Sequence, residues 1–240
     1  MSRERGLTLT EVLIIVAMVL VIAAIAIPGL ISSNRASNER TASTTLKTLT
    51  AAQADFRAND RDWNHVNDFW TADVKSLYTM TRAGIRGAGT APDDPPIRLI
   101  DIETAAADAD PTFFAAGGEN MTLQTFAPPA TLKGYWYAAL LRDQTVKDTP
   151  EAIYKQDTAG TPPMGKVHNT SKFGFLAFPD SWSTGAYNFR VNENNTIFRE
   201  KLIEKPRTGH AVPPGLNAVP PAFLDWPEDE TLKSYLRRLD

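Results

Sequence analysis

One stretch decides the fold: Met1-Ser-Arg-Glu-Arg-Gly6-Leu7-Thr-Leu-Thr-Glu11, followed by Val12-Leu-Ile-Ile-Val-Ala-Met-Val-Leu-Val-Ile-Ala-Ala-Ile-Ala-Ile27-Pro28-Gly29. Glu11 stands at the start of an apolar run that carries no other charge until Arg35. A plain membrane anchor gains nothing from an acid at its apolar edge. A secretory signal peptide places its small-residue cleavage site after the apolar core, whereas here the small residue precedes it. The acid therefore indicates a task beyond anchoring.

The apolar run is long enough to cross a membrane. Residues 12–34 carry no charge, and as a helix they would span about 34 Å, against a hydrocarbon core of about 30 Å. Arg3 and Arg5 precede the run and bias that end of the chain to the cytoplasm. The rest of the chain is then expected to face the periplasm or the exterior.

The helical pattern continues beyond the apolar run. Apolar residues recur at spacings of three and four, which predicts one buried face on an otherwise polar helix; they are Ala42, Leu46, Leu49, Ala52 and Phe56. We predict one helix from near Leu7 to near Asn59, apolar all round in its first half and packed on a head domain in its second. Pro28 removes a helical hydrogen bond at a cost of roughly 3 kcal/mol, and Gly29 adds roughly 1 kcal/mol relative to Ala. These two residues mark either a kink or a helix break.

This constellation resembles the type IV pilin-like proteins, that is, the pilins and the pseudopilins of type II secretion. The resemblance rests on the short basic leader, Gly6, Leu7, Glu11, the apolar length and Pro28. It implies that a prepilin peptidase cuts after Gly6 and that the new amino group of Leu7 is N-methylated. It also implies that Glu11 pairs with the free amino group of a neighbouring subunit. The first mature residue of the family is most often Phe, where this chain has Leu7.

The head sequence predicts an antiparallel β-meander. Four segments have strand composition, at 133–141, 173–178, 186–191 and 196–202, and the asparagines at 192–195 predict a β-hairpin between the last two. A polar insertion, 142–171, separates the first two strands. We also expect a helix over 71–80 capped by Thr71, a strand over 97–102 and a brief helix over 103–109. Acids precede bases after Pro227, with an apolar stripe, which predicts a short C-terminal helix.

The predicted fold class is therefore α+β, a long N-terminal helix packed on an antiparallel meander, as in pilins. The expected parts are a cleaved leader (1–6), a transmembrane and assembly helix (7–34), an amphipathic half of the stem (35–62), a globular head (63–205) and a proline-rich tail with a short helix (206–240).

Composition restricts the function. The net charge of −3 and the absence of a long basic run argue against nucleic acid as a partner. The chain has no cysteine, hence no thiol nucleophile and no disulfide, and it departs there from pilins that close a C-terminal loop with a disulfide. Three histidines lie far apart in the sequence, and no HExxH, phosphate loop or nucleophile elbow occurs. We therefore predict neither enzymatic activity nor a cofactor.

An acid-rich stretch gives weak calcium candidates. Asp93, Asp94 and Asp101 offer oxygen ligands, as Ca²⁺ prefers, and some pseudopilins use calcium to order a head loop. The acids have no EF-hand spacing, and a solvated loop is the favoured interpretation. The sequence predicts no metal site.

The main hypothesis is a structural subunit of a type IV pilus-like or type II secretion-like filament. Its expected partners are other pilin-like subunits, the prepilin peptidase and, before assembly, the bacterial inner membrane, with the N-terminus cytoplasmic. After assembly it would lie in a periplasmic or cell-surface filament. Major pilin, minor pilin and pseudopilin stay open. The alternatives are a membrane-anchored exported binding module that does not polymerise, and an exported enzyme head.

Overall fold

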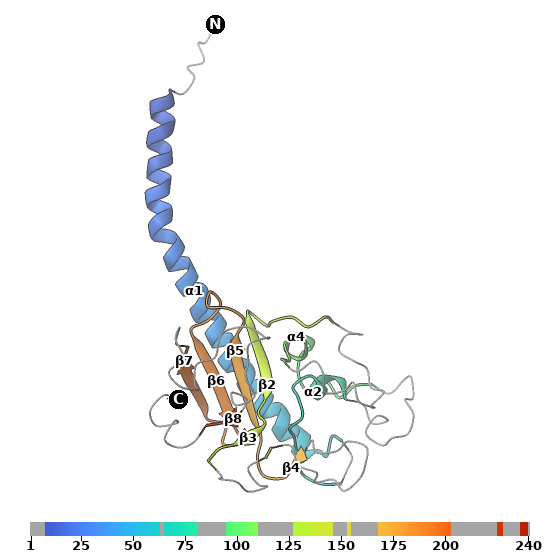
Figure 1. The fold of residues 1–240 in the computed structure, drawn as a ribbon. Coiled ribbons are helices and arrows are strands. Elements are labelled where there is room, and N and C mark those ends of the chain that lie inside the picture. Colours follow the sequence, from blue (N-terminus) through green and yellow to red (C-terminus); the bar gives the residue numbers. More distant parts are fainter. Residues whose placement is uncertain are drawn as a thin grey trace.

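The computed structural model describes residues 8–62, 65–80, 95–109, 127–145, 153–154, 168–202, 225–227 and 236–239. The N-terminal part of one long helix projects from a head, and its C-terminal part lies along a β-sheet (Figure 1). The predicted fold class is confirmed.

Helix α1 (Leu9–Ala58) forms the stem. It begins at a capping box, in which the side chains of Thr8 and Glu11 each accept from the other's backbone N–H, and it ends where Asn59 N–H donates to Asp55 O. The helix continues through Pro28, and it is long and apolar enough to cross a membrane. The prediction of one helix from near Leu7 to near Asn59 is confirmed.

The main sheet has five strands in the order β2-β5-β6-β7-β9, and every neighbouring pair is antiparallel. The strands are β2 (Tyr135–Ala139), β5 (Gly174–Pro179), β6 (Tyr187–Asn192), β7 (Ile197–Lys201) and β9 (Leu236–Leu239). The hairpin between β6 and β7 turns at Asn195, whose φ of 54° is one that asparagine tolerates. The four-stranded meander expected from the sequence is confirmed, and β9 adds a fifth strand at its edge.

Both faces of this sheet are covered. Because successive side chains of a strand point to opposite faces, Tyr135, Tyr137 and Ala139 of β2 pack with the buried face of α1. Trp136 and Ala138 point the other way, into a second apolar cluster that includes Tyr154 and Trp226. Double burial explains why β2 is buried at every position.

Smaller elements complete the head. Strand β1 (Phe69–Trp70) pairs antiparallel with β4 (His168–Asn169), and β3 (Arg142–Asp143) pairs in parallel with β8 (Asp225–Trp226). Helices α2 (Ser76–Thr79) and α4 (Ile102–Ala106) pack beside each other. The predicted insertion thus contributes two strands, β3 and β4, that bind distant parts of the chain.

Two local expectations for this part of the head were wrong. The strand predicted over 97–102 is absent, because the N–H groups of Ile97 and Leu99 donate to Met80 O and Leu77 O beside α2 and because α4 already begins at Ile102. Thr71 does not cap a helix, since α2 starts only at Ser76; its hydroxyl donates to Tyr154 O instead.

The C-terminal helix was wrong where the structure describes it. Leu236–Leu239 is strand β9, which binds the outer edge of β7 with Ile197 opposite Leu239. The free edge of β7 offers a full ladder of backbone hydrogen bonds to this segment, which outweighs a helix pattern only one turn long. Residues 228–235 lie outside the described part of the chain.

Candidate assembly site

The projecting part of α1 carries a large exposed apolar surface. From Leu9 to Ile31 its long apolar side chains are all more than two-fifths exposed. Among the described residues, the exposed large hydrophobic side chains elsewhere are those of Ile153 and Trp182. An apolar surface of this extent requires lipid or protein cover. In Figure 1 the head covers none of it.

Glu11 lies at the very start of this surface. Its Oε2 accepts from Thr8 N–H at 2.8 Å and from the Thr8 hydroxyl at 2.9 Å, while Glu11 N–H donates to Thr8 Oγ1 at 3.3 Å. The carboxylate therefore sits at the positive end of the helix dipole, where a negative charge is favourable. Both Thr8 donors go to Oε2, which leaves Oε1 without a hydrogen bond among the described residues. The carboxylate thus keeps an acceptor oxygen for a further cation.

A polar joint fixes where the stem meets the head. Arg35 Nε donates to Ser183 O at 3.3 Å, and Asn38 Nδ2 donates to Thr184 O at 3.0 Å. Glu39 Oε1 accepts from Ala186 N–H at 2.9 Å. These contacts join one turn of α1 to the turn between β5 and β6. On the N-terminal side of these contacts, α1 projects from the head (Figure 1).

Below the joint, α1 is locked by its core face. Gln53 lies fully buried and binds both backbone groups of Trp70, accepting from its N–H at 3.0 Å and donating to its carbonyl. Phe56 packs on the Trp70 ring at 6.3 Å between centroids. Strand β1 is therefore attached to the last turns of the stem.

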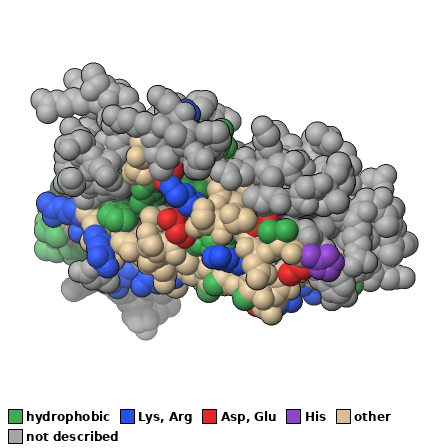
Figure 2. Space-filling view, turned by 90° about the horizontal axis from the view of Figure 1, so that it is seen from below, with side chains coloured by type: hydrophobic (Ala, Val, Ile, Leu, Met, Phe, Trp, Pro, Cys, Tyr) green, Lys and Arg blue, Asp and Glu red, His purple; other side chains and the backbone are tan. Residues whose placement is uncertain are grey.

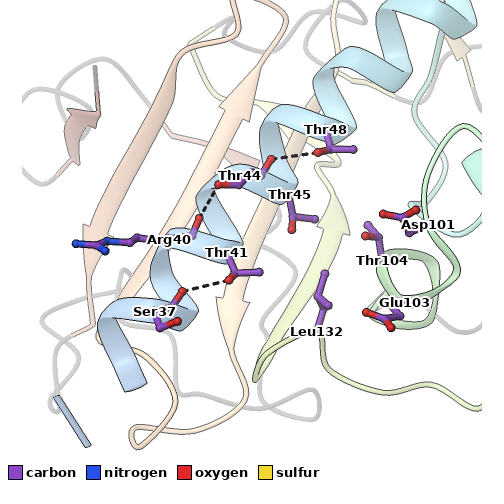
Figure 3. A pocket seen from close by; sticks show the side chains of 10 residues that line it. All are labelled: Ser37, Arg40, Thr41, Thr44, Thr45, Thr48, Asp101, Glu103, Thr104 and Leu132. Carbon is purple, nitrogen blue, oxygen red and sulfur yellow. Dashed lines mark hydrogen bonds between the residues drawn. The ribbon is translucent and has the colours of Figure 1, made fainter. Parts of the chain in front are cut away.

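A polar groove of about 450 Å³ runs between α1 and α4. The lining residues are Ser37, Arg40, Thr41, Thr44, Thr45, Thr48, Asp101, Glu103, Thr104 and Leu132. Figure 3 shows the acids facing the threonines across the groove, with Arg40 pointing away from them. Three of the threonines donate their hydroxyl protons to carbonyls one turn earlier in α1. The groove consequently presents mostly acceptor oxygens.

The end of the head opposite the stem is mixed in character. On the described part of that face, hydrophobic, basic and acidic side chains are interspersed (Figure 2). His65 has a side chain 86% exposed, with its Nδ1 3.6 Å from Asp60 Oδ2. Burial comes first among the causes that raise the pKa of Asp60, followed by a hydrogen bond with the side chain of Asp62.

A buried group of ionisable side chains in the head was not predicted from the sequence. Asp62, Asp68 and His168 are each 1% exposed, and one potential metal-ligand atom from each lies within 4.8 Å of the others. Asp62 and Asp68 lie close together in the sequence, but His168 is far from both, so no spacing rule predicts the group. Only the pairing of β1 with β4 brings His168 to the two acids.

Comparison with curated proteins finds a similarity to a type IV pilin. The chain is 35% identical over 106 residues to the type IV major pilin protein PilA of Myxococcus xanthus (strain DK1622), a match that covers 44% of this chain and 46% of that protein. This chain therefore matches somewhat less than half the length of its curated relative. No family model matches, and no solved structure matches. The chain is pilin-like.

Of the residues that the pilin resemblance singles out, Glu11 is placed by the structure at the helix N-terminus. Gly6 and Leu7 lie outside the described residues, so cleavage and N-methylation stay predictions. Pro28 and Gly29 lie within the continuous α1 of this pilin-like chain, and a Cβ added at Gly29 would meet nothing within 4 Å. A helix break at these two residues stays a prediction.

The acids proposed for calcium are not shown together. Asp93 and Asp94 lie outside the described residues. Asp101 precedes α4 at its N-cap position without a side-chain capping bond, and it lines the polar groove. Asp101 is not a member of the buried group that has metal-ligand spacing.

Proposed function

We propose that this pilin-like chain is a non-enzymatic structural subunit of a type IV pilus-like or type II secretion-like filament. In the assembled filament, the apolar part of α1 from each subunit packs against the same part of its neighbours. The head stays outside this helical core and presents its surface to solvent or to a partner.

The division of α1 carries the proposal. One continuous helix is apolar and exposed over its first half, and it is buried on a sheet over its second half, at Leu46, Leu49 and Phe56. A membrane anchor needs only the exposed apolar half of the helix. It does not require that this half continue without a break into a half that packs on the head. The 35% identity to a type IV major pilin over 106 residues supports the same function.

The steps of assembly follow from the pilin resemblance. The precursor inserts with its N-terminus cytoplasmic, and the prepilin peptidase cuts between Gly6 and Leu7. The new amino group, N-methylated, stands one residue before the helix cap. Glu11 supplies the opposite charge for the Leu7 amine of the next subunit. Away from bulk water such a charge pair is stronger than at an exposed surface, and an unpaired carboxylate there costs a few kcal/mol.

A matched pair of variants tests the role of Glu11. Glu11→Gln keeps the chain length and an oxygen able to accept from Thr8 N–H, as glutamine does in capping boxes, but it removes the charge. Thr8→Ala removes the capping hydroxyl at a cost of about 1 kcal/mol but leaves the charge in place. We expect Glu11→Gln to accumulate in the membrane without filaments, and Thr8→Ala to assemble.

Filaments sheared from cells, quantified by antibody and electron microscopy, are the measurement, and total protein in the membrane fraction is its control. Filament yields equal to wild type for Glu11→Gln would overturn the charge pairing. If wild-type protein is absent from every sheared or periplasmic filament, the chain is instead the membrane-anchored binding module. The groove between α1 and α4 would then be its first candidate binding surface.

A further inference from the structure

The buried group of Asp62, Asp68 and His168 joins three separate segments of the head. Asp62 lies just after the end of α1, Asp68 immediately precedes β1, and His168 belongs to β4. Because Trp70 pairs with His168 in the β1–β4 ladder, the sheet register sets the imidazole beside the segment that contains Asp68. Each of these side chains is 1% exposed.

The distances between the side-chain ligand atoms of the group are close to those of a metal site. Asp62 Oδ2 lies 2.7 Å from His168 Nε2, and one ligand atom from each residue lies within 4.8 Å of the others. Around a tetrahedral zinc ion with bonds of about 2.0–2.1 Å, neighbouring ligand atoms stand about 3.3 Å apart. Shifts of roughly an ångström therefore bring the three atoms to coordination distance.

The imidazole is held in place by its surroundings. The Trp70 ring meets it edge-on at 5.4 Å between centroids. Both of its nitrogens are buried without a hydrogen-bond partner among the residues that the structure describes, although Nε2 lies 2.7 Å from Asp62 Oδ2. A buried imidazole nitrogen is costly unless it meets a hydrogen-bond acceptor, a proton donor or a metal.

The charge of the group also favours a cation. Two carboxylates and one imidazole, nearly removed from water, carry a net charge of −2 with a neutral histidine or −1 with a charged one. Asp62 and Asp68 also interact with other parts of the head, and buried carboxylates with such partners are still able to bind a metal. A divalent cation balances both carboxylates and takes the neutral imidazole as its third ligand.

We propose that Asp62, Asp68 and His168 bind a divalent transition-metal ion, and that zinc fits the site best. Calcium and magnesium take oxygen ligands almost entirely, whereas an imidazole with carboxylates suits zinc. The ion ties the end of the stem helix to β1 and β4. In a head without cysteine it takes the structural place that a disulfide holds in other exported proteins.

The test uses the full-length protein in detergent, stripped with a chelator and then titrated with Zn²⁺ by calorimetry. We expect one zinc per chain and a rise in melting temperature on zinc addition. His168→Gln and Asp68→Asn should each weaken binding at least tenfold and abolish that rise. His65→Gln is the matched control, because its side chain is 86% exposed and lies outside the group; it should bind like wild type.

Co²⁺ gives a readout that does not depend on stability. We expect visible absorption bands of a low-symmetry Co²⁺ site in wild type and in His65→Gln, and their loss in His168→Gln. Near-UV circular dichroism establishes that each variant is folded. The proposal is overturned if stripped wild-type protein binds no Zn²⁺, or if it binds Zn²⁺ equally well after His168→Gln. An unchanged melting temperature with zinc would also overturn it, and would assign the group as an Asp62–His168 ion pair only.

Discussion

The same substitution at two positions of α1 separates the two halves of the stem. Leu49 is fully buried against the sheet, whereas Leu20 is 63% exposed on the projecting part. Replacing a buried leucine by alanine removes its apolar contacts and leaves a cavity, which costs roughly 2–5 kcal/mol. Exposed substitutions usually stay within about 0.5 kcal/mol. Since domains of this size are stable by roughly 5–15 kcal/mol, Leu49→Ala should remove a large part of the head's stability.

The assay is urea unfolding of the full chain in detergent, followed by the fluorescence of the buried tryptophans Trp70, Trp136 and Trp226. We expect Leu49→Ala to lower the midpoint strongly and Leu20→Ala to leave it unchanged. In cells the result should be reversed for assembly: Leu20→Ala gives stable protein but fewer filaments, because it removes packing between stems. A Leu49→Ala protein within about 0.5 kcal/mol of wild type would refute the account of how the stem docks on the head.

Two further predictions concern the head. Gly185→Ala places a Cβ 2.1 Å from the Tyr135 hydroxyl oxygen, which must then move from Tyr187 O, so we expect a loss of roughly 1–3 kcal/mol. Calorimetric melting measures it, and a wild-type melting temperature would show that the turn has room. Burial alone would raise the pKa of Asp143, but hydrogen bonds from Lys172 and Thr145 outweigh it, and the pKa is lowered. A lowered pKa gives stability that is full above about pH 4, the unfolded value, and that is lost as pH falls through the folded value. Asp143→Asn should therefore flatten the acid limb of the stability profile, and identical acid limbs would contradict this.

Local patterns in the sequence were sufficient for the stem and the meander. The spacing of Ala42, Leu46 and Leu49 marked the face of α1 that the structure buries, because helical periodicity is read within a single element. The hairpin at 186–202 was likewise predictable, since its turn residues lie between two alternating strands. Thr8 and Glu11 have the spacing of a capping box, so the N-terminal end of α1 is also predictable from the sequence.

Features that depend on distant pairings were not predictable. Leu236 and Leu239 fit a helical stripe, yet the open edge of β7 decides their conformation. The joint at Arg35, Asn38 and Glu39 depends on backbone groups of the turn after β5, which have no sequence signal. His168 meets Asp62 and Asp68, which are close to each other in the sequence, only because β1 pairs with β4.

Intact mass of the protein in sheared filaments tests the central claim most directly. We predict filaments that contain this chain without residues 1–6, beginning at Leu7 and carrying one added methyl group. A protein that keeps residues 1–6, stays in the membrane fraction and is absent from filaments would contradict it.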